Sequence, residues 1–166
     1  MGGRIDAPLR SYEGRVAPDW LDARGRFRPI FALLPIQDAN AAWFDHLGVG
    51  PDYTRREAHA LFALESHMLL APEILLGAGE PLTIASQLLG FRSNRLHAIH
   101  SVYGGADRRP VASLESVSIH VDSRRRRAAP MRPGPRARIE AVWRRHRDLP
   151  APAALGRAIR PIAGRA

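Results

Sequence analysis

The chain has 166 residues, which suits one domain with a sizeable hydrophobic core, and it holds no apolar run long enough for a membrane-spanning helix. The absence of cysteine excludes disulfides, thiolate metal ligands and a cysteine nucleophile. The formal net charge is +9, and it comes from arginine because the sequence has no lysine. With no apolar leader behind Met1, we expect a cytoplasmic protein.

The basic charge is concentrated towards the C-terminus. Residues 1–123 hold 12 arginines and 14 acidic residues, whereas residues 124–166 hold 13 arginines and 2 acidic residues. Such a segment can attract the phosphates of nucleic acid, but a solvated arginine-rich surface explains the same pattern. We therefore expect neither a nucleic-acid partner nor a membrane partner.

The predicted elements begin with a strand over residues 13–20 and a loop over residues 22–28. Residues 29–47 then carry apolar side chains at spacings of three and four, which predicts a helix with one buried face. Pro35 leaves two alternatives for its start. Either the helix begins at Pro29 and is kinked at Pro35, or residues 30–34 form a separate turn and the regular helix begins at Pro35.

A polar connection is expected over residues 52–57, and strands over residues 59–70, 81–91, 95–103 and 111–121. Because the connections between these strands are short, we expect them to pair antiparallel. In the first of them, alternation predicts that Phe62, Leu64 and Met68 face the helix. The sequence thus predicts an α+β domain in which a long antiparallel sheet wraps around one central helix.

The C-terminal part is predicted to be an extension of this domain. Residues 128–135 are rich in proline and alanine and form a linker, and residues 136–149 form a short arginine-rich helix. We therefore divide the chain into a main domain, residues 1–127, and a basic extension, residues 128–166.

Several short segments of this chain, taken in order, are similar to those of one protein family. They are residues 15–25 before the helix, 47–53 after it, and 64–67, 79–81, 95–100, 114–122 and 126–130 in and around the strands. With them the chain resembles the hotdog-fold acyl-CoA thioesterases of the 4-hydroxybenzoyl-CoA thioesterase-like superfamily, and in particular the branch that includes betainyl-CoA thioesterases. The resemblance implies a homo-oligomer paired through its sheets, with acyl-CoA bound between subunits and no cofactor.

The resemblance also implies a catalytic carboxylate in the loop before the central helix, and Asp22 matches that position. Gly25 would permit the turn, and backbone N–H groups around Phe27, Arg28 and Ile30 would polarise the thioester carbonyl. This division of labour is chemically sound. A thioester is already activated, so a carboxylate and donors for the developing negative charge are the main requirements.

The same loop departs from the family pattern, which commonly reads Asp-x-Asn-Gly-His-Met-Asn. Here the Asn, His and second Asn positions are Arg24, Arg26 and Arg28, and Pro29 lacks an N–H group. Three guanidinium groups near Asp22 would lower its pKa, but ion pairing would block attack. A degraded homologue that binds acyl-CoA or acts as a scaffold therefore stays open beside the enzyme, as does a thioesterase that acts on acyl-carrier-protein thioesters.

Further candidates lie on the strands and after the last of them. Glu65 and His67 share a strand face, and they either line the pocket, with Glu65 as a second base, or form a structural hydrogen bond at a subunit interface. Arg125 and Arg126 are candidates for the phosphates of coenzyme A, against the alternative of solvated charge. No metal site is expected: the two histidines at positions 97 and 100 point to opposite faces of a strand.

Overall fold

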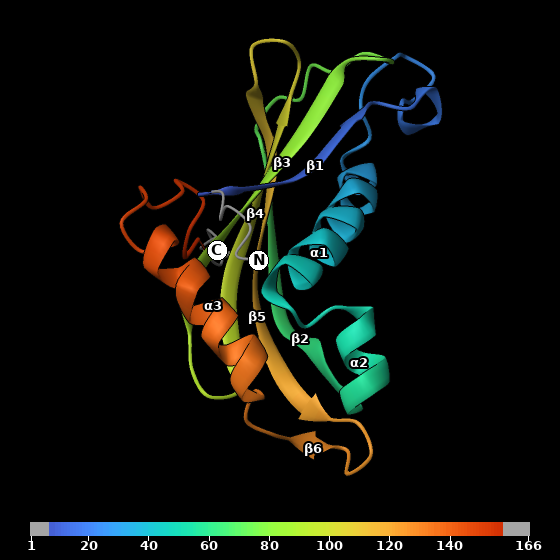
Figure 1. Ribbon diagram of the computed structural model, residues 1–166. Helices are drawn as coiled ribbons and strands as arrows, with labels where there is room; N and C mark the ends of the chain where they lie inside the picture. Colours follow the sequence, from blue (N-terminus) through green and yellow to red (C-terminus); the bar gives the residue numbers. More distant parts are fainter. Residues whose placement is uncertain (1–6, 158–166) are drawn as a thin grey trace, which may run out of the picture.

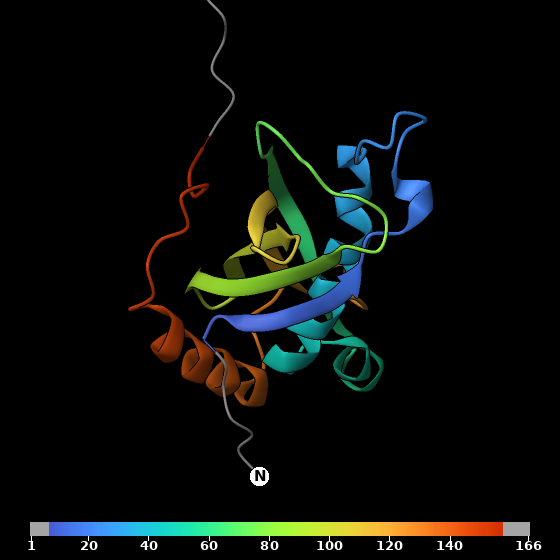
Figure 2. The same cartoon turned by 90° about the horizontal axis from the view of Figure 1, so that it is seen from above.

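The structure, a computed structural model, describes residues 7–157 and consists of an antiparallel sheet that curls around one helix (Figure 1). The strands lie in the order β1-β3-β4-β5-β2, and β6 pairs with β5. Their bounds are Leu9–Arg15 for β1, His59–Leu70 for β2, Pro81–Phe91 for β3, Arg95–Gly104 for β4, Arg109–Asp122 for β5 and Arg127–Ala128 for β6. This confirms the predicted α+β class, and Figure 2 shows the curl of the sheet from above.

The start of the central helix matches neither a helix that begins at Pro29 nor one that begins at Pro35. A short 3-10 helix, η2 (Pro29–Ala32), leads directly into α1 (Leu33–Leu47), so Pro35 lies in the first turn of α1. Because first-turn N–H groups have no acceptor within a helix, proline is tolerated there. The face of α1 that carries Ile36, Ala39, Trp43 and Leu47 is buried against the sheet.

One predicted connection and the end of one predicted strand are wrong. The polar segment before β2 is a helix, α2 (Pro51–Glu57), in which Pro51 occupies the first turn and Tyr53 is buried. The first strand ends at Arg15, and Pro18–Trp20 forms a 3-10 helix, η1, because Pro18 removes a donor that a strand would need. Both segments are too short for periodicity to distinguish helix from loop or strand.

Strand β2 contains a bulge that reverses its two faces. Its register with β5 shifts between Ala63 and Glu65. As a result Phe62 and Leu64 are 56% and 52% exposed, whereas Met68 packs against the core. The prediction that Phe62 and Leu64 face the helix together with Met68 is therefore wrong, because the extra residue places Phe62, which precedes the bulge, and Met68, which follows it, on opposite faces.

The C-terminal helix α3 (Pro133–His146) begins and ends three residues earlier than predicted. Ile139 and Val142 are fully buried in the same apolar cluster as Trp43 of α1, so α3 packs against α1 and the sheet. The division of the chain into residues 1–127 and 128–166 stays a prediction, and residues 158–166 lie outside the described part. Among the described residues, no helix is long and apolar enough to cross a membrane.

Candidate functional site

The loop that carries Asp22 is a tight hairpin between η1 and η2. The Asp22 N–H donates to the Arg26 carbonyl at 2.8 Å, and the Gly25 N–H donates to the Asp22 carbonyl at 2.9 Å. Gly25 has a φ of +73°, a conformation that glycine adopts without steric cost. Phe27 is buried against Trp20 at the base of the hairpin. The loop therefore holds Asp22 just before the start of the central helix.

The two oxygens of the Asp22 carboxylate have different partners. Oδ1 accepts the backbone N–H groups of Arg24 and Arg26 at 2.8 and 2.9 Å, whereas Oδ2 accepts the Arg26 guanidinium, with Nε at 2.9 Å and a terminal nitrogen at 2.8 Å. These contacts, the Arg26 backbone N–H first among them, hold the pKa of Asp22 below its usual value. A lowered pKa is as predicted, although it comes from Arg26 and the Arg24 backbone rather than from three guanidinium groups.

The backbone donors around residues 27–30 are partly used by the fold. The Arg28 N–H donates to the Trp20 carbonyl at 2.9 Å, and Pro29 has no N–H group. No backbone acceptor is shown for the N–H groups of Phe27 and Ile30 in the described structure. Of the amides that we expected near the carbonyl, Arg28 is therefore already satisfied within the loop.

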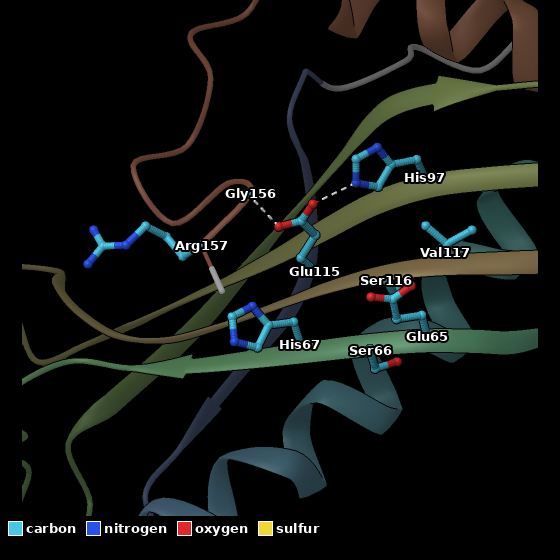
Figure 3. Close-up of a pocket in the computed structure, with 9 residues that line it drawn as sticks. All are labelled: Glu65, Ser66, His67, His97, Glu115, Ser116, Val117, Gly156 and Arg157. Atoms are coloured by element: carbon cyan, nitrogen blue, oxygen red, sulfur yellow. Dashed lines mark hydrogen bonds and ion pairs between the residues drawn. The ribbon is translucent and has the colours of Figure 1, made fainter. Parts of the chain in front are cut away.

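Glu65 and His67 line a hollow of about 500 Å³ on the sheet (Figure 3). The β2–β5 register brings His67 opposite Glu115, whose carboxylate also pairs with His97. The His97 Nε2–Oε1 distance is 2.7 Å, and the Gly156 N–H donates to the other oxygen at 2.8 Å. Asp22 is not among the residues that line this hollow. Glu65 and Asp22 are thus not brought together within one chain.

Sequence reasoning assigned no role to His97 and Glu115. Their residue types are suitable for hydrogen bonding to a ligand, but their meeting depends on the pairing of β4 with β5, which places them across neighbouring strands. The only signal that could have indicated this pair is the register of β4 with β5, and the sequence alone does not determine that register.

Arg125 and Arg126 lie in the turn between β5 and β6, and they point into different hollows. Arg125 lines a hollow of about 420 Å³ with His59 and Arg127, whereas Arg126 lines one of about 310 Å³ with Phe62. Figure 1 shows this turn at the bottom of the molecule and the Asp22 loop, drawn in blue, at the top. The arginines and Asp22 therefore lie at opposite ends of a single chain.

Comparison with known proteins places the chain in a protein family. Residues 16–139 match the thioesterase-like superfamily. The chain belongs to this superfamily. The thioesterase-like chain is 35% identical to the betainyl-CoA thioesterase of Pseudomonas aeruginosa, over 91% of this chain and 94% of that protein. It is 32% identical to an L-carnitine dehydrogenase/betainyl-CoA thioesterase of Agrobacterium fabrum over 78% of this chain, and spans about a quarter (26%) of that longer relative.

Solved structures of thioesterase-like proteins share the fold. A candidate thioesterase of Pseudomonas putida KT2440 is 29% identical, with a TM-score of 0.77 over 95% of this chain and 99% of that one. The Staphylococcus aureus protein SAV2348, solved in complex with CoA, has a TM-score of 0.82 at 17% identity over 96% of this chain and all (100%) of that one, which shows the fold alone. The predicted hotdog fold is confirmed, and the named relatives support thioester hydrolysis as the activity.

Proposed function

We propose that this protein hydrolyses an acyl-CoA thioester to the free acid and CoA, with Asp22 as the reacting carboxylate. The observation that carries the proposal is the asymmetry of Asp22. Backbone N–H groups orient one oxygen, while an exposed guanidinium holds the other. Exposed ion pairs contribute little to stability, so an incoming acyl-CoA can displace Arg26 and uncover Oδ2.

Asp22 can act in either of two ways. Oδ2 can attack the thioester carbon and expel CoA as the thiolate, which takes up a proton; water then hydrolyses the resulting mixed anhydride to the free acid and regenerates the carboxylate. Alternatively it accepts a proton from a water molecule that attacks the same carbon. In both cases the carbonyl oxygen becomes negative, and the N–H groups of Phe27 and Ile30, at the entry to the central helix, are the donors that suit it.

The complete site requires two copies of the chain. Strand β2 is an edge of the described sheet, and its exposed side chains include Phe62 and Leu64. If two β2 edges pair antiparallel about a two-fold axis, the β5–β6 turn of one copy lies towards the Asp22 end of the other. Acyl-CoA would then span the interface, with its phosphates near Arg125 and Arg126 and with Glu65 and His67 nearby as lining residues.

The acyl group is proposed from the relatives. The 35% identical protein of Pseudomonas aeruginosa is named a betainyl-CoA thioesterase, so betainyl-CoA is the first substrate to assay.

A second candidate function has one observation in its favour. Because Arg26 occupies Oδ2 in the unliganded chain, the protein could instead bind acyl-CoA without hydrolysing it.

Release of the CoA thiol from a panel of acyl-CoA thioesters distinguishes the two functions. We expect turnover by the natural protein and a loss of about 10²–10⁴-fold in kcat for Asp22→Asn, because the amide is neither a base nor a nucleophile. Asp19→Asn, a change at an exposed position three residues earlier, is the matched control. CoA binding without turnover by the natural protein would instead establish the binder, and full activity of Asp22→Asn would remove Asp22 from the mechanism.

A further inference from the structure

A basic hollow of about 420 Å³ lies where the start of β2, the β5–β6 turn and the segment leading into α3 meet. Its charged side chains are Arg125, Arg127, Arg132 and Asp122, and His59 lies beside them. We propose that this hollow binds a phosphate monoester and, resting on the proposed function, that its occupant is the 3′-phosphate of CoA. Three guanidinium groups around one cavity suit a doubly charged terminal phosphate, which can accept a separate hydrogen-bonded pair from each.

The carboxylate in the hollow is used by the backbone of the turn. Asp122 Oδ1 accepts the N–H groups of Arg124 and Arg125, both at 3.0 Å, while Oδ2 lies 3.9 Å from the Arg125 Nε. The carboxylate therefore shapes the turn and neutralises Arg125 only weakly. No carboxylate within residues 7–157 is shown paired with Arg127. The guanidinium groups consequently remain available to an anion.

The segment that carries Arg127 and Arg132 is held in place by a buried histidine outside the hollow. His120 is fully buried, and its Nδ1–H donates to the Ala129 carbonyl at 2.8 Å, so its Nε2 must accept the Tyr53 hydroxyl at 2.9 Å. The Met131 N–H donates to the Ser93 carbonyl at 2.8 Å. These bonds attach the segment that carries Arg127 and Arg132 to the sheet and to α2. The arginines therefore extend from a fixed backbone.

His59 adds a buried polar group to the site. It is 6% exposed, it stacks on His120 at 5.1 Å, and its Nδ1–H donates to the Glu57 carbonyl at 2.7 Å. Among the described residues, its Nε2 has no hydrogen-bond partner shown, and His59 lines the hollow. Nε2 can accept a phosphate O–H group or, when protonated, donate to a phosphate oxygen. A buried histidine that lines a hollow rich in arginine is more typical of a binding site than of a solvated surface or a packed core.

The start of α3 borders the hollow and carries no negative charge that would repel an anion. Pro133, the first residue of this 14-residue helix, also lines the hollow, and the first turn contains no acidic residue. Because Pro133 and Pro135 have no N–H group, the helix start supplies few donors of its own, and its partial positive charge adds only modestly to that of the arginines. Arg132 is 3.9 Å from the exposed Glu57 carboxylate, a contact long enough to yield to a phosphate. Arg126 lines a separate hollow and lies outside this site.

Comparison of CoA with dephospho-CoA, which lacks only the 3′-phosphate, tests the proposal. We expect the natural protein to bind CoA at least about tenfold more tightly in calorimetry, and to show a KM for acyl-CoA lower by a similar factor, with kcat alike for the two forms. The double variant Arg127→Gln/Arg132→Gln should lose this preference. Both positions are exposed, so the fold should survive, which circular dichroism can verify. Arg124→Gln, in the same turn but lining no hollow described above, should keep the preference.

The outcomes separate this proposal from the proposed function. If both thioesters are hydrolysed with the same KM, the phosphate site is wrong while the thioesterase stands. If no thioester is hydrolysed but CoA still binds better than dephospho-CoA, the site stands and the proposed function fails. If inorganic phosphate stabilises the natural protein and not the double variant, yet CoA has no advantage over dephospho-CoA, the hollow binds phosphate from another source and its assignment to CoA is wrong.

Discussion

The two oxygens of Asp22 show how a single substitution in a loop can change the state of a reactive group. Arg26 occupies the position where the family commonly has histidine, and its guanidinium, 68% exposed, covers Oδ2 of a carboxylate that is 28% exposed. Its backbone N–H would remain with any other side chain, so the loop geometry does not depend on the guanidinium. The arginine therefore affects access to Asp22 and its ionisation more than the shape of the hairpin.

We expect Arg26→Gln to raise kcat/KM by about twofold to fivefold, because the acyl-CoA no longer has to displace an ion pair. The change should also move the acid limb of the pH–rate profile upward. Asp22 must be ionised to react, and its lowered pKa keeps it ionised below the usual value near 4, so activity falls only as the pH drops through that lowered pKa. Without the guanidinium the loss begins at a higher pH.

Arg24→Gln is the matched control, since Arg24 contacts Asp22 through its backbone N–H. Its profile should resemble that of the natural protein. Identical acid limbs in Arg26→Gln and the natural protein would mean that another group, and not Asp22, is titrating.

Strands β1, β3 and β4 are joined by a polar chain inside the core. His100 Nδ1 lies 2.6 Å from Ser86 Oγ, which lies 2.7 Å from Ser11 Oγ. Burial lowers the pKa of His100 to about 4. The folded protein therefore keeps this ring neutral at pH values where the unfolded chain protonates it, and the sheet carries an acid-sensitive element unrelated to the proposed chemistry.

We expect the free energy of unfolding to fall as the pH decreases from about 6.5 to about 4, with roughly 3 kcal/mol of the loss due to His100. Above this window neither state binds the proton, and below it both do. Denaturant titrations at pH 7 and pH 4.5 measure the loss. The pKa of His120 is lowered as well, so the contribution of His100 is the difference between the natural protein and His100→Asn. An equal loss in both would contradict the assignment.

The helix α3 packs on the rest of the chain through a few buried side chains. Truncation of one of them tests how much this packing stabilises the protein. Ile139→Ala should lower the free energy of unfolding by about 2–5 kcal/mol, because it leaves a cavity in the buried cluster that also contains Trp43. Denaturant unfolding followed by tryptophan fluorescence should show one transition. Arg136→Ala, on the exposed face of α3, should change little. Two separate transitions would favour the predicted division after residue 127.

For the whole molecule, the main consequence of the fold is that the proposed reacting group and the proposed phosphate ligands are at opposite ends (Figure 1). The two ends of one chain therefore do not form a single site for the same acyl-CoA molecule. An antiparallel pair of β2 edges would solve this problem by symmetry, since each copy would supply Asp22 to one site and arginines to the other.

Hybrid dimers test this arrangement. Asp22→Asn and Arg125→Glu/Arg127→Glu should each have little activity alone at low acyl-CoA concentration. When the two variants are co-expressed, random pairing should restore about a quarter of the natural activity, because half of the dimers contain one intact site of two. No recovery, despite dimers seen in ultracentrifugation, would place the complete site within one chain.

Local patterns in the chain were enough to predict the antiparallel strands and the central helix, because hydrophobic periodicity and turn residues act over a few neighbouring positions. Asp22 and Gly25 were singled out by the resemblance to the hotdog thioesterases, because they match the Asp and Gly of the family's loop motif. The folded chain was needed to assign the two faces of β2, where a bulge reverses the alternation, and to find the grouping of His59 with Arg127 and Arg132. It was also needed to show that the Arg26 guanidinium pairs with one oxygen of Asp22 while backbone N–H groups hold the other. Strand register and the meeting of distant side chains depend on the packing of the whole sheet, and no local pattern records that packing.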